Sequence, residues 1–184
     1  MLTSHQYGHH THYCRSTITY SSKYKSKDFY KGNILGKEQQ KAIEEYLKSN
    51  SYKINSKLYN KEDLNEEDKE FINRLDEALK GMPIYRGWVN RSVYVQDSED
   101  VANVLSIFNN EQRIGHWKSY ISSSLGIYDT KFKMIMKIKS KTGRNLSALN
   151  DEGGGEILFM RNTDFQLLDI KKKNDIIYVK LEEL

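Results

Sequence analysis

The sequence predicts an α+β domain in which helices come first and a largely antiparallel β-sheet follows. Between residues 37 and 108, apolar side chains recur every three or four positions, which is typical of helices that bury one face. After residue 131 they recur at every second position, which is typical of strands. Because no helical stretch separates these strands, a regular β-α-β repeat is not expected, and the pattern favours antiparallel sheet.

The composition is that of a single folded domain. The chain has 184 residues, of which 38% are hydrophobic, and its 13 tyrosines argue against wholesale disorder. No apolar run approaches the roughly 20 residues that span a bilayer, and the N-terminus lacks the hydrophobic core of a Sec-type signal peptide. We therefore expect no membrane partner. The single cysteine, Cys14, excludes an intramolecular disulfide framework.

Residues 1–35 are predicted to form a basic, histidine-containing N-terminal arm, and residues 36–184 the folded domain. Within residues 1–33, five basic side chains stand against one acid, so the whole net charge of +4 lies there. Such an arm binds phosphate groups or an acidic partner, or is simply a solvated tail. It also holds Cys14 and four of the five histidines, but nothing predicts a packed frame for metal ligands, so we expect no metal.

Three helices are predicted. The first spans residues 37–49, the second runs from about Asn60 to Leu79 and is stopped by Gly81, and a weaker third begins near Ser98. Acidic residues crowd the first half of the second helix, where the helix dipole favours them. The apolar stripes of the three helices are Ala42, Ile43, Tyr46 and Leu47; Leu64, Phe71, Ile72, Leu75 and Leu79; and Val101, Val104, Leu105 and Phe108.

Four strands are predicted in the C-terminal half. The first covers residues 132–139, where apolar side chains alternate with mostly lysine, so that one face is largely polar. The others cover residues 156–160, 165–170 and 176–181, and a polar Lys-Lys-Asn-Asp turn joins the last two.

Three short motifs carry the chemistry, while the common dinucleotide, P-loop, zinc-protease and serine-hydrolase signatures are missing from the sequence. An arginine stands between an aromatic residue and a glycine in Tyr85-Arg86-Gly87-Trp88. Hydroxyls follow an aromatic–aliphatic pair in residues 120–125, and a glutamate joins three glycines to an apolar strand in residues 153–159. Each motif alone is weak, but their order and context form a strong combination.

This combination resembles the R-S-E class of mono-ADP-ribosyltransferases, a family of bacterial toxins and exoenzymes. Residues 42–58 also look like the family's helical segment that leads into the NAD site, and residues 161–168 look like its continuation after the catalytic glutamate. The match covers the chain from about Gly36 to the C-terminus. It implies the ADP-ribosyltransferase fold, with N-terminal helices packed on a core of two antiparallel β-sheets, and makes residues 36–184 the catalytic domain.

The resemblance implies NAD as the substrate and gives three residues catalytic roles. Glu156 would stabilise the positive charge that develops on the ribose when the bond to nicotinamide breaks. Arg86 would bind the diphosphate with its planar guanidinium, and Ser122 would hold Glu156 and the ribose in register. By the same resemblance, the backbone of Gly87 would hold the nicotinamide amide, Tyr46 and Asn55 would line the adenosine side, and Tyr128 or Phe132 would stack on nicotinamide. Nothing in this chemistry requires a metal.

The motif departs from the family at the position that usually helps to select the acceptor. Two residues before Glu156 the family carries a glutamate or a glutamine, whereas this chain has Gly154. Glu152, four residues upstream of Glu156, is the candidate acceptor-side acid in its place. Bond cleavage by Glu156 does not depend on this position, but the choice of acceptor does.

The predicted function is therefore a toxin or effector that transfers ADP-ribose from NAD to a protein side chain. One alternative is the same chemistry on RNA or DNA, as in a toxin of a toxin–antitoxin or phage-defence system. Another is an NAD glycohydrolase or an inactive NAD-binding module. The acceptor is expected in the cytoplasm, of a host or of a target cell, where NAD is available. The protein would be secreted or injected, or held in check by an antitoxin or immunity protein.

Overall fold

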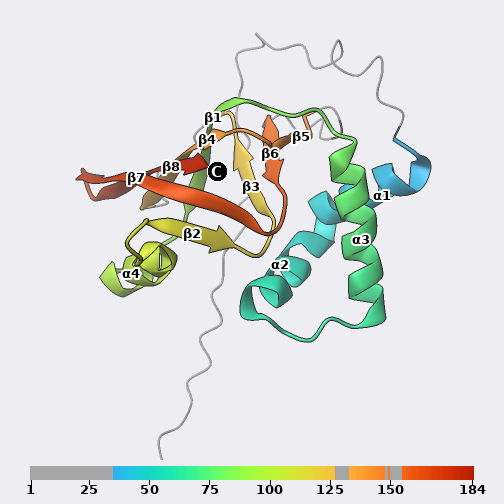
Figure 1. The fold of residues 1–184 in the computed structure, drawn as a ribbon, viewed down its shortest axis with the longest axis horizontal. Helices are drawn as coiled ribbons and strands as arrows, with labels where there is room; N and C mark the ends of the chain where they lie inside the picture. Colours follow the sequence, from blue (N-terminus) through green and yellow to red (C-terminus); the bar gives the residue numbers. More distant parts are fainter. Residues whose placement is uncertain (1–34, 127–132, 148, 150–154) are drawn as a thin grey trace, which may run out of the picture.

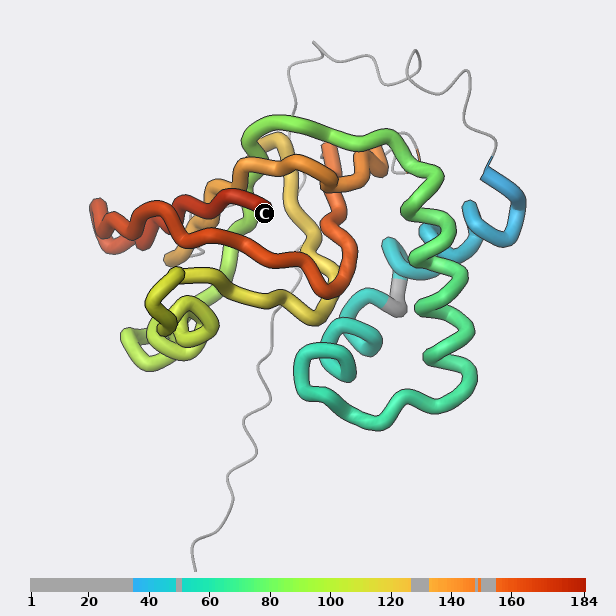
Figure 2. The backbone as a smooth tube through the Cα atoms, in the orientation of Figure 1, coloured from blue at the N-terminus to red at the C-terminus, as the bar shows by residue number. Residues whose placement is uncertain are grey.

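The computed structural model describes residues 35–126, 133–147, 149 and 155–184 (Figures 1 and 2). Two parts lie side by side and share a hydrophobic cluster: a layer of helices and a bent β-sheet. The α+β class predicted from the sequence is confirmed. No helix in the described part of the chain is long and apolar enough to cross a membrane.

The helical layer consists of α1 (Lys37–Glu45), a π-helical turn η2 (Tyr46–Asn50), α2 (Ser51–Asn60) and α3 (Glu66–Lys80). The first predicted helix is confirmed, but the helical path continues through η2 and α2 to Asn60. The prediction that the second helix starts near Asn60 is wrong, because residues 61–65 form a loop. α3 begins after Asn65, whose side chain accepts a hydrogen bond from the Asp68 backbone N–H at 2.8 Å.

The sheet strands and the remaining helical turns follow. They are β1 (Gly87–Val93), α4 (Ser98–Leu105), η3 (Ser106–Phe108), β2 (Ile114–Trp117), β3 (Ile121–Ser124), β4 (Met134–Ser140), β5 (Arg144–Asn145), β6 (Glu156–Phe159), β7 (Thr163–Lys173) and β8 (Ile176–Glu183). The four predicted strands correspond to β4, β6, β7 and β8. Asn174 and Asp175 turn the chain between β7 and β8 with positive φ angles of 50° and 60°.

Within the described residues the strands form one eight-stranded sheet in the order β2-β7-β8-β4-β1-β3-β6-β5. The expected two antiparallel sheets are therefore joined into one, and the pairing of β4 with β8 is parallel. The joint is narrow, since the register between β1 and β3 consists of the single pair Asn90↔Ser124. We call β3, β6 and β5 the covered half of the sheet, and β2, β7, β8, β4 and β1 the open half.

Two hydrophobic cores hold these parts together. The first lies between the two halves of the sheet, because Val89, Met136 and Leu181 of the open half cluster with Ile121 and Phe159 of the covered half. α4 packs against this core and lies beside β2 and β7 (Figure 1).

The second core lies between the covered half and the helical layer. Its buried members are Ile43, Tyr46, Ile54, Phe71, Ile72, Leu75, Ala78, Leu79, Met82, Tyr120, Leu146 and Leu158. β3 and β6 thus contribute to both cores, one from each of their faces. In the open half, the face that is turned away from the first core carries no helix in the described structure (Figure 1).

Candidate active site

Ser122 and Glu156 meet on the face of the covered half that is turned towards the helices. Directly paired residues of neighbouring strands project to the same face, and Ser122 is paired with Leu158, a member of the second core. Glu156, two residues from Leu158, is therefore on this face as well. The Ser122 hydroxyl donates to Glu156 Oε1 at 2.6 Å, and both side chains are half-buried. The structure thus brings together two of the three predicted catalytic residues.

The backbone before Glu156 requires a glycine. Gly155 has φ of +58°, and a Cβ there would lie 2.8 Å from Leu125 Cδ1. Its carbonyl accepts a hydrogen bond from the Leu125 N–H at 3.2 Å, which ties the end of β3 to the start of β6. The predicted residues Glu152 and Gly154 lie outside the described residues.

A partly buried polar network behind the pair connects the start of β3 to α3. The Tyr120 hydroxyl donates to Asp76 Oδ1 at 2.5 Å, and Arg161 Nε donates to Asp76 Oδ2 at 2.8 Å. Burial and the Asp76 carboxylate raise the pKa of Tyr120, so its hydroxyl stays protonated and remains a donor. The network fixes Tyr120, two residues before Ser122.

Asp76 was not predicted from the sequence. The signal that would have found it is its place in the helix, four residues after Ile72 and three before Leu79. An acid within an apolar stripe is a candidate for a buried, paired carboxylate.

Tyr46 and Asn55, which the resemblance placed on the adenosine side, attach the helical layer to the same strand. Asn55 Nδ2 donates to the Tyr46 hydroxyl at 2.9 Å, and Asn55 Oδ1 accepts from the Tyr120 N–H at 3.1 Å. Tyr46 is buried, and its ring meets that of Tyr120 edge-on at 5.5 Å between centroids. In this structure both residues therefore position β3, and their contact with NAD stays a prediction.

Arg86 is exposed at the start of β1 and makes no hydrogen bond or ion pair with any residue that the structure describes. An open pocket of about 560 Å³ lies around it, and its lining residues are Arg86, Gly87, Trp88, Lys139, Ser140, Lys141 and Thr142. A Cβ at Gly87, where φ is +157°, would lie 2.9 Å from the Tyr85 hydroxyl oxygen. Glycine at this position thus leaves room for the Tyr85 ring.

The turn between β4 and β5 supports the segment that carries Arg86. The Tyr85 N–H donates to the Gly143 carbonyl at 2.7 Å. The turn is held in its place by the buried carboxylate of Glu183, which accepts from the Thr142 N–H at 2.8 Å and from the Ser140 hydroxyl at 3.4 Å. Arg86 is thus placed by the backbone, and its guanidinium is left available for a ligand.

Arg91 is a second residue that sequence reasoning missed. Its Nη1 donates to the Ser122 carbonyl at 2.7 Å, across the narrow joint between β1 and β3. This bond reinforces the strand that carries the Ser122 hydroxyl where the backbone ladder is shortest. No local sequence signal reveals it, because it depends on which strands are neighbours.

The described residues contain no group of three or more His, Cys, Asp or Glu side chains that could hold a metal ion. The predicted ring contacts Tyr128 and Phe132, and the histidines and Cys14 of the N-terminal arm, lie outside the described residues.

Chemically, the Ser122–Glu156 pair offers a carboxylate oriented by a hydroxyl, and the pocket around Arg86 offers an available guanidinium. The first pair suits a developing positive charge, and the guanidinium suits a phosphate. These are the groups that cleavage of a nucleotide glycosidic bond requires from a protein.

Comparisons with known proteins identify the family and the fold. Residues 21–184 match the family model described as ADP-ribosyltransferase exoenzyme. This match begins inside the segment predicted as an N-terminal arm. A search of curated protein sequences finds no match.

Solved structures show the same fold. Exoenzyme S from Pseudomonas aeruginosa, solved with human 14-3-3 protein beta and carba-NAD, has 19% identity and a TM-score of 0.68, covering 83% of this chain and 76% of its own. The Clostridium limosum C3 exoenzyme has 15% identity and a TM-score of 0.65, with 83% and 87% covered. Vis from Vibrio splendidus, solved with agmatine, has 17% identity and a TM-score of 0.62, with 82% and 76% covered.

The family model covers residues 21–184, which is most of the chain, and the solved structures share its fold. The chain therefore belongs to the ADP-ribosyltransferase exoenzyme family, whose members transfer ADP-ribose from NAD.

Proposed function

We propose that this chain is a toxin or effector that transfers ADP-ribose from NAD to a protein side chain, with Arg86, Ser122 and Glu156 as its catalytic residues. The observation that carries the proposal is the 2.6 Å hydrogen bond from the Ser122 hydroxyl to Glu156 Oε1. It fixes one carboxylate oxygen of Glu156 beside the Ser122 hydroxyl.

The side chains divide the reaction between them. The bond between the ribose C1′ and the nicotinamide nitrogen breaks, its electron pair leaves with nicotinamide, and Glu156 stabilises the positive charge on the ribose. Arg86 binds the diphosphate through bidentate donors, and Ser122 keeps Glu156 in register. An acceptor nucleophile then bonds to C1′ and releases its proton to solvent or to a base. Gly87, Tyr46, Asn55 and Tyr128 complete the proposed NAD site.

A protein acceptor is favoured over a nucleic acid by two observations on relatives. Exoenzyme S was solved with a 14-3-3 protein, and Vis was solved with agmatine, which carries the guanidinium group of an arginine side chain. We propose that the reaction takes place in the cytoplasm of the cell that holds the acceptor, because NAD is available there. An antitoxin or immunity protein would restrain the enzyme in the cell that makes it.

The test of the acceptor class uses NAD labelled in its adenylate part and whole-cell lysates. We expect the protein to label macromolecules, and protease to remove the label while RNase and DNase leave it. Label that nucleases remove would contradict the protein acceptor, and release of nicotinamide without any macromolecular label would identify a glycohydrolase.

The role of Glu152 is tested in the same assay. If the acceptor needs no side-chain base, Glu152→Ala leaves both transfer and nicotinamide release nearly unchanged, and this is the outcome we expect. Three glycines separate Glu152 from Glu156, so its carboxylate is poorly preorganised for catalysis. Selective loss of transfer, with nicotinamide release intact, would instead make Glu152 the acceptor-side acid.

A further inference from the structure

The face of the sheet that carries Glu156 continues across β1 onto the open half. The register pairs Glu156 with Ser124, Ser124 with Asn90, Asn90 with Lys137, and Lys137 with Lys180. Because directly paired residues project to the same face, this row runs from the catalytic carboxylate to exposed lysines. The helices cover only the first part of the row.

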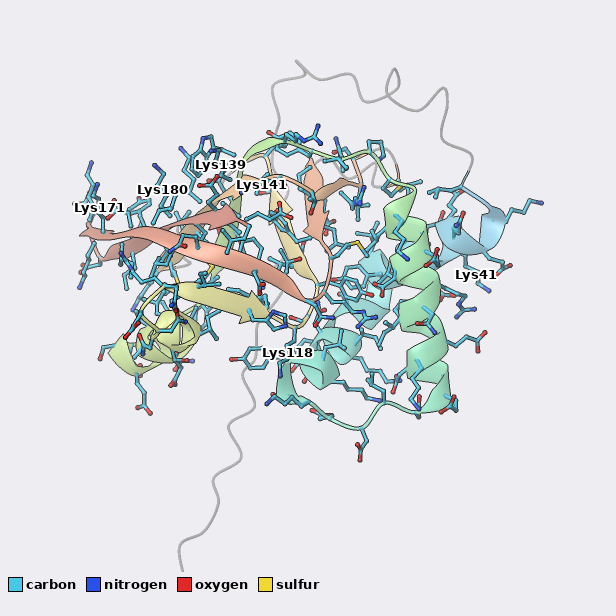
Figure 3. The ribbon with its side chains drawn as sticks, in the orientation of Figure 1. Lys41, Lys118, Lys139, Lys141, Lys171 and Lys180 are labelled. Carbon is cyan, nitrogen blue, oxygen red and sulfur yellow. The ribbon has the colours of Figure 1, made fainter. Side chains whose placement is uncertain are left out.

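The exposed part of this face is strongly basic. Six lysines lie on it or at its edge, and we call this group, together with Trp88 and Tyr178, the basic face: Lys137, Lys139, Lys141, Lys171, Lys173 and Lys180. Three carboxylates lie on the same face, Asp164, Asp169 and Glu182, so three positive charges remain in excess. Figure 3 shows Lys139, Lys141, Lys171 and Lys180 along the open half, far from Lys41 on the helical layer.

At the centre of the basic face, two lysines lie side by side, an arrangement that does not stabilise the fold. Lys137 and Lys180 are directly paired on neighbouring strands, an arrangement of like charges that destabilises a sheet. Both ammonium groups approach the ring of Trp88, at 5.3 Å and 5.1 Å from its centroid, and this ring offsets part of the repulsion. Trp88 nevertheless remains 37% exposed, and Tyr178 remains 39% exposed.

The basic face also borders the pocket around Arg86. Trp88, Lys139 and Lys141 line that pocket together with Arg86. A partner that covers the basic face would therefore lie beside a catalytic residue, where an acceptor side chain has to be delivered.

We propose that the basic face is the docking surface for the acidic surface of a protein acceptor. This inference rests on the proposed function, since it supplies the recognition that the proposed protein acceptor requires. Tryptophan and tyrosine at the middle of a charged, exposed patch are typical anchors of protein interfaces. The excess positive charge selects an acidic partner and speeds its approach.

Details of the basic face favour a protein over a nucleic acid. Glu182 accepts from Lys139 at 3.1 Å, and Asp169 forms an ion pair with Lys171 at 2.8 Å, so carboxylates alternate with lysines along the face. A continuous phosphate backbone would be repelled by these carboxylates. A protein surface can instead place a basic side chain opposite each carboxylate and an acidic one opposite each lysine. The Trp88 ring is already engaged by two ammonium groups, which makes it a poor stacking platform for bases.

The experiment compares the double variant Lys137→Gln/Lys180→Gln with the control Lys41→Gln/Lys48→Gln, whose lysines lie exposed on the helical layer. Transfer of labelled ADP-ribose to nuclease-treated lysate protein and release of nicotinamide without acceptor are measured side by side. We expect the first variant to lose transfer about tenfold or more and to retain nicotinamide release. We expect the control to retain both, and neither melting temperature to fall by more than about 3 °C.

Competition identifies the partner's chemistry. A poly-glutamate peptide is expected to inhibit transfer by the wild type without inhibiting nicotinamide release, and to lose its effect in Lys137→Gln/Lys180→Gln. Unchanged transfer in this variant would overturn the proposal, as would stronger competition by a single-stranded oligothymidylate of equal charge. Loss of nicotinamide release in the variant would also overturn it, because the lysines would then serve the NAD reaction. If the wild type forms a dimer and the variant does not, the proposal is also overturned, because a second copy of the chain would then occupy the basic face.

Failure of the proposed function gives a different result. A wild-type protein that does not cleave NAD would sink the catalytic assignment. Binding of poly-glutamate, measured by tryptophan fluorescence, would still occur in the wild type and be lost in Lys137→Gln/Lys180→Gln, because it depends only on the lysines. The two proposals can therefore fail separately.

Discussion

The covered and open halves of the sheet share one continuous face but use it in opposite ways. In the covered half, β6 reads as an unbroken apolar run, because Ile157 and Phe159 enter the first core and Leu158 the second. In the open half, β4 alternates methionine or isoleucine with lysine over most of its length. The difference shows that the helices create the site: where they cover the sheet, a serine and a glutamate are half-buried and fixed, and beyond them the same face is exposed and basic.

The largest expected effect contrasts a carboxylate on each half. Glu156→Gln keeps the shape of the side chain but removes the negative charge opposite the ribose. We expect nicotinamide release and transfer to fall about 10²–10³-fold, or about 3–4 kcal/mol of transition-state stabilisation. Glu182→Gln removes a carboxylate of the open half, one that pairs with Lys139. This variant should leave nicotinamide release unchanged. Steady-state kinetics of both variants check the contrast, and near-wild-type turnover by Glu156→Gln would remove the catalytic assignment.

A smaller effect contrasts two aspartates that pair with cations. Asp76 is 14% exposed and binds Arg161 and Tyr120 beneath the site, whereas Asp169 is 42% exposed and pairs with Lys171 at the surface. Asp76→Asn should lower the free energy of unfolding by about 2 kcal/mol, because the partly buried Arg161 cation loses its counter-charge. Asp169→Asn should leave the urea midpoint unchanged. Equal midpoints for the two variants would show that the network beneath the site does not hold the layers together.

The smallest effect concerns Arg86, at the border of the two halves. Arg86→Lys keeps the charge but loses the planar pair of donors, so NAD affinity should fall roughly tenfold, or about 1.4 kcal/mol. The melting temperature should not change, because Arg86 contacts no described residue by hydrogen bond or ion pair. Calorimetric titration with NAD measures the loss. Unchanged affinity together with a lowered melting temperature would make Arg86 a structural residue.

The parts of the fold that periodicity governs could be predicted from the sequence. α1, α3, β4, β7 and β8 each repeat their apolar residues with the period of their element. The start of α3 could not be placed, because Leu64 packs against the second core from a loop and so continues the helical pattern without being helical. β2 and β3 were missed as strands because their sequences, Ile-Gly-His-Trp and Ile-Ser-Ser-Ser, show neither an apolar run nor an alternation of apolar and polar residues. The serines of β3 are stabilised by neighbours, as Ser123 donates to the Ile157 carbonyl at 2.7 Å.

The candidate site was predictable only in part. Motif order pointed to Ser122 and Glu156, and the register of β3 and β6 then brought them together. Asp76 and Arg91 could not be predicted, because their roles depend on which helix and which strand become neighbours of β3. The basic face was hidden for the same reason, since its lysines come from separate strands that only the sheet order assembles.

The narrow joint between β1 and β3 has a consequence for the tuning of the enzyme. One ladder pair, the Arg91 bond and a 3.5 Å bond from the Ser124 hydroxyl to the Asn90 carbonyl join β1, beside Arg86, to β3, which carries Ser122. The gap between these groups is therefore governed by the thickness of the first core, through side chains such as Val89 and Ile121. On the proposed assignment, a methylene gained or lost there changes the spacing between the phosphate-binding Arg86 and the bond-breaking Glu156. Apolar residues outside the proposed NAD site would then set how well the two ends of NAD fit at once.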